Sequence, residues 1–198
     1  MASKAENEIR QVVVDWFHEN EPSGRVVHEI KVADGRRRAD LGVIFTDFMI
    51  LIEIKSKNDV LKRLEDQFVE FQKHSNFCLM VVDEKHFDGK LLKNQSWMRY
   101  AHESHLWKFP NNNWSFCRYG NYTPPASFQF LNLLWNEELK EEMIAAGLET
   151  HSGQVRWQMV RDLEYSLTGK KVREAVCRQL RKREFHRADP PIFEYPKA

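Results

Sequence analysis

Two carboxylates and one lysine in the first third of the chain have the residue types and spacing of a hydrolytic site. Glu53 and Lys55 stand two residues apart near the end of an apolar run, and Asp40 precedes them. Side chains alternate between the two faces of a strand, so Glu53 and Lys55 should share a face. A carboxylate and an ammonium at the end of an apolar strand are costly unless they are paired or used. These three residues are therefore the first candidates for chemistry.

The chemistry that fits this set is metal-assisted hydrolysis of a phosphodiester. A tight reversal between the strands could bring Asp40 beside Glu53, where two carboxylates would repel each other and a divalent cation would relieve the repulsion. Oxygen ligands without a cysteine partner favour Mg²⁺ or Mn²⁺. Such a cation activates water and neutralises charge on a phosphate, and a nearby lysine stabilises the same charge. The alternative interpretation is a surface ion pair between Glu53 and Lys55.

The surrounding pattern predicts an α/β fold that positions these residues. Apolar residues recur at helical spacing in two segments, and three strand-like runs between these segments are joined by short connections. A strand, a helix and an apolar strand in succession predict a crossover to a parallel position. The expected order is a helix over residues 4–19, an antiparallel meander over 25–32, 38–45 and 48–55, a helix over 59–74, and a strand over 77–82.

The second half of the chain is expected to be mainly helical. Residues 105–109 and 114–118 could form a hairpin, and Pro124-Pro125 indicates a boundary. We expect three helices after it, over 127–146, 153–167 and 170–185, punctuated by glycines. The predicted division is a core over residues 1–125 and a helical appendage over 126–198.

Charge and cysteine usage narrow the class of protein. The net charge of +1 shows no global bias toward nucleic acid, but the segment 170–187 holds eight Lys or Arg against two Glu. This basic segment is either a phosphate footprint or the solvated face of a terminal helix. The residues that would contact nucleic acid are Lys170, Lys171, Arg181 and Lys182. Three scattered cysteines do not suggest a disulfide framework, and no apolar run suggests a signal peptide or a membrane span. A cytoplasmic location is the simplest expectation.

The acidic pair and its surroundings resemble the PD-(D/E)XK nuclease superfamily. The resemblance rests on the runs Arg38-Ala39-Asp40 and Glu53-Ile54-Lys55-Ser56, followed by Asp59, Leu61, Arg63-Leu64 and Gln67. More narrowly, the chain is similar to a group of small bacterial and phage proteins of this fold. That group shares an E-x-E-I-R helix (Glu6–Arg10 here), a glutamate on the first strand (Glu29) and an L-L-W-x-x-E-L stretch (Leu133–Leu139). The resemblance is close over residues 6–85 and loose over the C-terminal helices.

The resemblance implies a restriction-endonuclease-like core and hydrolysis of DNA by metal-activated water. Lys55 would support the nucleophile and the transition state. The expected metal ligands are two carboxylates, a backbone carbonyl and one further acid, namely Asp40, Glu53, Ile54 and either Glu8 or Glu29. The choice between Glu8 and Glu29 is open at this point.

Four further polar residues lie near the motif, and three of them have two interpretations each. Gln67 is either an amide satisfied by a nearby loop or a group that orients Lys55 or the attacked phosphate, and we favour the second, since a glutamine on this helix lies near the active site in several branches of the superfamily. Arg36 and Arg38 either hold substrate phosphates or form a charged hairpin end. Asp59 is expected to cap the helix that follows it.

Two rival functions remain open on sequence alone. A module of nuclease fold could bind or assemble on nucleic acid without turnover, with its basic C-terminal helix as the contact surface. A nuclease could also act on RNA or on branched structures, because a fold does not determine a substrate. Many nucleases of this type act as dimers, so a homodimer is a candidate assembly, although the sequence shows no interface for one.

Overall fold

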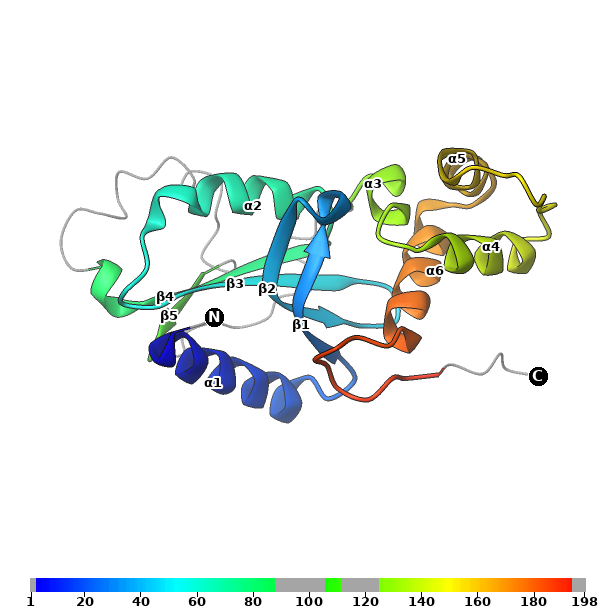
Figure 1. Cartoon of the computed structure of the whole chain (residues 1–198). Coiled ribbons are helices and arrows are strands. Elements are labelled where there is room, and N and C mark those ends of the chain that lie inside the picture. The colour runs from blue at the N-terminus through cyan, green and yellow to red at the C-terminus, as the bar shows by residue number, and fades with distance from the viewer. Residues whose placement is uncertain (1–2, 88–105, 112–124, 194–198) are drawn as a thin grey trace.

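A five-stranded mixed sheet forms the centre of the molecule in the computed structural model, which describes residues 3–87, 106–111 and 125–193 (Figure 1). The strands lie in the sheet in chain order, namely β1 (Arg25–Val32), β2 (Arg37–Ile44), β3 (Met49–Lys55), β4 (Phe77–Asp83) and β5 (Leu106–Phe109). The first three strands are antiparallel, and β3, β4 and β5 are parallel. The predicted α/β class, meander and crossover are therefore confirmed, while residues 114–118 lie outside the described part of the chain.

Helices α1 (Lys4–Asn20) and α2 (Leu64–Gln72) lie on opposite faces of the sheet (Figure 1). The hydroxyl of Ser3 accepts the Glu6 N–H at 3.1 Å and so caps α1. A 3₁₀ turn, η2 (Leu61–Arg63), leads into α2 and replaces the first part of the predicted helix. The two helices cover the two faces of β3, which is why every residue of β3 is buried.

The prediction that Asp59 caps the following helix is wrong. Neither η2 nor α2 has a side-chain cap. The Asp59 carboxylate instead accepts the N–H of Ser56 at 2.8 Å and its hydroxyl at 2.6 Å. Asp59 therefore closes the loop directly behind β3.

Strand alternation assigns the polar end of β3 to the α2 face. Met49 and Leu51 pack in the hydrophobic cluster on the side of α2, whereas Ile50, Ile52 and Ile54 pack in the cluster on the side of α1. Glu53 and Lys55 continue the first series. Their side chains are therefore expected under α2, and this is where they make their contacts.

The C-terminal part contains four helices rather than the three predicted. They are α3 (Ser127–Leu131), α4 (Asn136–Ala145), α5 (Arg156–Ser166) and α6 (Gly169–Lys182). The expected helix over 127–146 is interrupted after α3, where the Asn132 amide donates to the Phe128 carbonyl at 2.9 Å. The Trp135 N–H then donates to Glu138 at 2.6 Å and starts α4. Local side-chain caps thus end one helix and begin the next without a glycine or proline.

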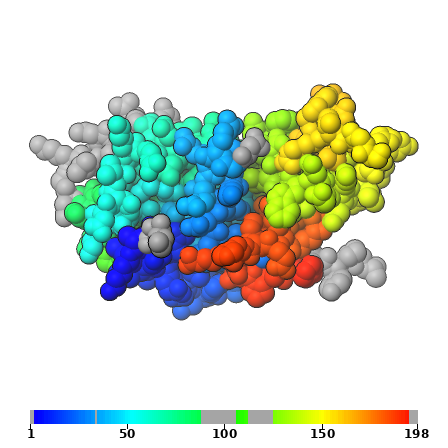
Figure 2. Space-filling model, viewed as in Figure 1, coloured from blue at the N-terminus to red at the C-terminus, as the bar shows by residue number. Residues whose placement is uncertain are grey.

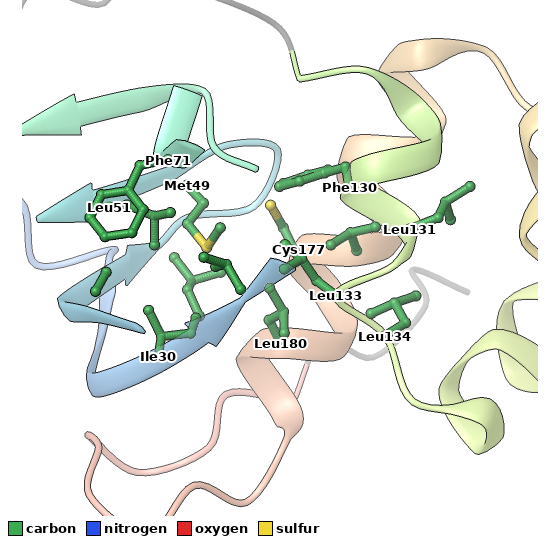
Figure 3. Packing of buried hydrophobic residues seen from close by; sticks show 14 of the residues in the cluster. Ile30, Met49, Leu51, Phe71, Phe130, Leu131, Leu133, Leu134, Cys177 and Leu180 are labelled. Atoms are coloured by element: carbon green, nitrogen blue, oxygen red, sulfur yellow. The ribbon is translucent and has the colours of Figure 1, made fainter. Parts of the chain in front are cut away.

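The sheet and the C-terminal helices share one hydrophobic cluster. Figure 3 shows Met49, Leu51 and Phe71 from the sheet side beside Phe130 and Cys177 from the helices, all buried in the same cluster. The predicted boundary near residue 125 therefore separates parts of the sequence that pack on a common core. Among the described helices, none is long and apolar enough to cross a membrane.

The segment after α6 returns to the edge of the sheet. The Arg187 carbonyl accepts the His28 N–H at 2.9 Å, and Asp189 exchanges hydrogen bonds with Val26. Asp189 also contacts His18 of α1 at 3.0 Å, and Figure 2 shows this segment, in red, beside α1. The described segment after α6 thus covers the edge of β1 up to His28, and it does not cover the second half of that edge.

Candidate active site

A cleft of about 420 Å³ opens at the end of the sheet where the predicted motif residues lie. Seven charged residues and one apolar residue line it, namely Glu6, Glu29, Arg38, Asp40, Glu53, Lys55, Asp59 and Ile54. Asp40, Glu53 and Lys55, which come from β2 and β3, therefore line the same cleft. The structure brings together the three residues singled out from sequence.

The cleft opens at Asp40, where β2 has no paired residue on either side in the described sheet. Pairing between β1 and β2 skips the position of Glu29 opposite Asp40, and pairing between β2 and β3 ends at Leu41 and Ile52. Glu29 has a φ of 55°, a left-handed conformation that is uncommon for a residue with a side chain. Such local departures from regular backbone concentrate at functional sites. Within the described sheet, Asp40 thus has no paired position on either side.

Asp40 is held by groups that replace the missing strand pairing. Its Oδ2 accepts the Ile54 N–H at 2.8 Å, and its Oδ1 accepts Arg10 Nη2 at 3.0 Å. The Asp40 carbonyl accepts Arg10 Nη1 at 2.5 Å. Arg10 is in turn fixed by Glu6 at 2.6 Å, one helical turn earlier on α1. The orientation of Asp40 therefore depends on a helix far from it in sequence.

Glu53 carries two donors on one oxygen and none on the other. Its Oε1 accepts Lys55 Nζ at 2.6 Å and Gln67 Nε2 at 2.5 Å. Its Oε2 and the Oε1 of Gln67 are buried without a hydrogen-bond partner among the described residues. A buried acceptor without a partner calls for an explanation such as an ion or water. Gln67 thus reaches the site as expected, through Glu53 rather than through Lys55.

Burial and mutual repulsion disfavour the charged carboxylates. Burial, followed by the neighbouring charge of Asp40, raises the pKa of Glu53 to about 7. The contacts with Lys55 and Gln67 act in the opposite direction and lower it. Burial also raises the pKa of Asp40, although the Ile54 N–H and Arg10 counteract it. A cation placed between the two carboxylates would reverse both shifts.

The available oxygen donors fit a magnesium-like cation that keeps part of its water shell, rather than a cation that protein side chains enclose completely. Among the described residues, no three His, Cys, Asp or Glu side chains gather closely enough to hold a metal ion by themselves. Asp40 and the unpartnered Glu53 Oε2 supply two oxygens. The Ile54 N–H faces Asp40, and a residue's N–H and C=O point to the same side of a strand, so the Ile54 carbonyl is on that side too. Mg²⁺ commonly takes one or two carboxylates and completes its shell with water and phosphate.

The two acids proposed to complete the site lie in different places. Glu8 is exposed on α1 and is not part of the cleft lining, whereas Glu6 is part of it. Glu29 lines the cleft but pairs with Arg38 at 3.1 Å. Sequence reasoning missed Glu6 and Arg10 as site residues, although the E-x-E-I-R run contains both at the four-residue spacing of a helical ion pair.

The predicted basic contacts are divided between the cleft and the helical part. Arg38 lines the cleft, whereas Arg36 donates to the Ala33 carbonyl in the turn before β2. On α6, Lys170 and Lys171 are exposed, Arg181 is buried, and Lys182 pairs with Glu141 of α4. Much of the basic charge near the end of α6 therefore holds this helix against α4.

The comparisons with known proteins identify a family, but they do not indicate an activity. Residues 1–190 match the model of the family described as bacteriophage P4 protein cII. The match covers almost all of the 198 residues, so the chain belongs to this family. No curated protein and no solved structure matches the chain. The function must therefore be inferred from the site.

Proposed function

We propose that this member of the bacteriophage P4 protein cII family is a metal-dependent nuclease that hydrolyses DNA phosphodiester bonds. The observation that carries the proposal is the convergence of Asp40, Glu53 and Lys55 in one cleft, at the point where the pairing of β2 with β3 ends. Fold stability does not require a buried Glu53–Lys55 pair next to a second, partly exposed carboxylate at this place. The same convergence supports a PD-(D/E)XK site on a restriction-endonuclease-like core.

Asp40, Glu53 and the Ile54 carbonyl would hold one Mg²⁺ or Mn²⁺ ion. The bound cation would supply Lewis-acid activation of the attacking water and neutralise charge on the phosphate. The unpartnered Oε2 of Glu53 supports this assignment, because it is a buried acceptor that no described residue satisfies. Burial and the charge of Asp40 raise the pKa of that carboxyl, and a bound cation would lower it. Arg10 keeps one Asp40 oxygen engaged and so fixes the direction of the carboxylate.

Lys55 would act on the reacting phosphate. Its Nζ lies 2.6 Å from Glu53 on the wall of the cleft, and its side chain is largely buried. A lysine held in this way can pair with a non-bridging phosphate oxygen as negative charge accumulates. In the hydrolysis, the water oxygen bonds to phosphorus, the bond to the leaving sugar oxygen breaks, and that oxygen takes up a proton.

A second candidate function is a nucleic-acid-binding module without turnover. The observation that favours it is the internal neutralisation of the site, since Lys55 pairs with Glu53 and Arg10 with Asp40. A chain that kept these pairs in the presence of Mg²⁺ would bind substrate without cutting it. Cleavage of RNA or of branched DNA is the third alternative.

One substrate panel separates these functions. Plasmid, linear duplex, single-stranded and branched DNA and a matched RNA would be incubated with the purified chain in Mg²⁺, in Mn²⁺ and in EDTA. The proposal expects DNA cleavage that requires the divalent cation, with product lengths that distinguish internal from terminal attack. Binding without cleavage of any form would favour the second candidate, and cleavage confined to RNA would contradict DNA as the substrate.

A further inference from the structure

A second cavity, of about 720 Å³, lies beside the carboxylate cleft. It is bounded by the uncovered half of β1 on one side and by the C-terminal helices on the other. Glu29 and Arg38, which pair at 3.1 Å, line both spaces. A ligand that occupied the cleft could therefore continue past this pair into the cavity.

One part of the cavity wall is apolar and aromatic. Ile30 comes from β1, Leu180 from α6, and Leu133 from the segment between α3 and α4 (Figure 3). Trp135 stands at the rim with 55% of its surface exposed. A large aromatic ring left exposed beside an apolar floor is suited to a flat ligand that can stack on it.

The position of the Trp135 ring is fixed from behind. The Arg183 guanidinium lies 4.4 Å from the centroid of this ring and is anchored by Glu138, which accepts Arg183 Nε at 2.7 Å. The Trp135 N–H donates to the same carboxylate. The indole therefore forms a preformed platform that needs little ordering when a ligand arrives.

The rest of the wall is basic. Among the described residues, Arg156 donates only to neutral oxygens, the Asn132 carbonyl at 2.8 Å and Asn136 Oδ1 at 3.4 Å. Lys31 and Arg187 are exposed and make no ion pair within the described part of the chain. Glu29 is the one acid among the described residues of the wall, and Arg38 neutralises it. The surplus of positive charge selects an anionic ligand.

We propose that this cavity holds one unpaired nucleotide of the substrate strand, adjacent to the phosphodiester in the cleft. The inference rests on the proposed nuclease function. A base would stack on Trp135 above the apolar floor, and its phosphate would lie among Lys31, Arg156 and Arg187. The volume is within the range of small-ligand pockets, roughly 300–1,000 Å³. The preferred substrates are therefore DNAs with a single-stranded end or junction rather than continuous duplex.

The test measures binding in EDTA, so that it is independent of metal-dependent turnover. Fluorescence anisotropy of a labelled oligothymidylate would be compared for the native chain, Trp135→Ala, Trp135→Phe and Arg187→Ala. Trp157→Ala is the matched control, because Trp157 is 54% exposed and also lies beside an arginine, Arg161, at 4.8 Å, but belongs to α5 outside the cavity. Thermal unfolding would verify that each variant is folded.

Trp135→Ala and Arg187→Ala are expected to raise the dissociation constant about tenfold or more, while Trp135→Phe and Trp157→Ala leave it near the native value. A duplex of equal length should bind more weakly. Native-like binding by Trp135→Ala, or equal losses in Trp135→Ala and Trp157→Ala, would overturn the proposal. Free thymidine monophosphate that competed as well as the oligonucleotide would show a mononucleotide site instead. Cleavage would be scored separately on gels, so that a failure of this binding inference can be distinguished from a failure of the proposed nuclease function.

Discussion

Arg10 binds both the backbone carbonyl and the carboxylate of Asp40, at 2.5 Å and 3.0 Å, although the two residues are thirty positions apart. The arginine is buried, and it also donates to Glu6 one helical turn earlier. This contact ties α1 to a strand position that has no paired residue on either side in the described sheet. The geometry of the cleft therefore depends on Arg10.

Arg10→Ala should therefore destabilise the fold as well as the site. Its loss leaves the Asp40 carbonyl and Glu6 without a buried partner, which costs about 2–4 kcal/mol in the free energy of unfolding. Urea denaturation of the metal-free chain would measure this. Arg37→Ala, an exposed arginine at the start of β2, is the control and should unfold like the native chain. Equal midpoints for the two variants would show that the Arg10 contacts contribute little.

The pH dependence of stability should carry the signature of Glu53. Its pKa is about 7 in the folded chain and near 4.5 when unfolded, so the folded state binds the extra proton between these values. The free energy of unfolding should therefore fall as pH rises from about 4.5 to 7. Glu53→Gln removes this component, so the stability of the native chain relative to the variant should decline across that window by up to about 3 kcal/mol. Urea midpoints at a series of pH values, with EDTA present, would measure the difference, and a constant difference would contradict the raised pKa.

Mg²⁺ should stabilise the folded chain through the same carboxylates. A cation that binds only the folded state at ten times its dissociation constant adds about 1.4 kcal/mol, or about 2–4 °C in the melting temperature of a chain this size. Thermal unfolding in MgCl₂ would be compared with NaCl of equal ionic strength. Asp40→Asn and Glu53→Gln should lose the response. A shift of equal size in these variants would place the binding of Mg²⁺ elsewhere.

Gln67 should act as a positioning residue. Its amide donates to the Glu53 oxygen that also accepts Lys55, and the bond lowers the pKa of Glu53. Gln67→Leu should reduce the cleavage rate about tenfold and move the rising limb of the pH–rate profile to higher pH, because Glu53 would hold its proton longer. Gln72→Leu on the same helix, outside the cleft, is the control. A lower rate with an unchanged pH profile would assign Gln67 a packing role only.

Local sequence patterns were sufficient for the strands that carry the motif. The alternation and short connections around Asp40 and Glu53 predicted β1 with the observed bounds and placed β2 and β3 within a residue or two. Period-two alternation also placed Glu53 and Lys55 on one face. These features depend on neighbours in sequence, which is why sequence alone could supply them.

Features that depend on distant contacts could not be predicted in the same way. The pairing of Arg10 with Asp40 requires α1 to lie at the open end of the sheet, and the E-x-E-I-R run does not indicate which carbonyl it meets. The left-handed conformation of Glu29 has no signal in its residue type. Asp59 was assigned as a cap because acids favour that position, but its carboxylate accepts the two donors of Ser56 instead. Tertiary proximity decided the Arg10 contact, whereas the Asp59 contact is a local one between residues three apart.

The most direct test of the proposed nuclease is DNA cleavage in Mg²⁺ by Lys55→Met and Lys57→Ala, purified in parallel with the native chain. Lys55 lies on the cleft wall, whereas Lys57 is exposed just beyond β3 and outside the cleft lining. The account predicts native cleavage by Lys57→Ala and a rate at least about 100-fold lower for Lys55→Met, with both variants folded. Cleavage by Lys55→Met at the native rate would contradict the assignment of this cleft as the active site.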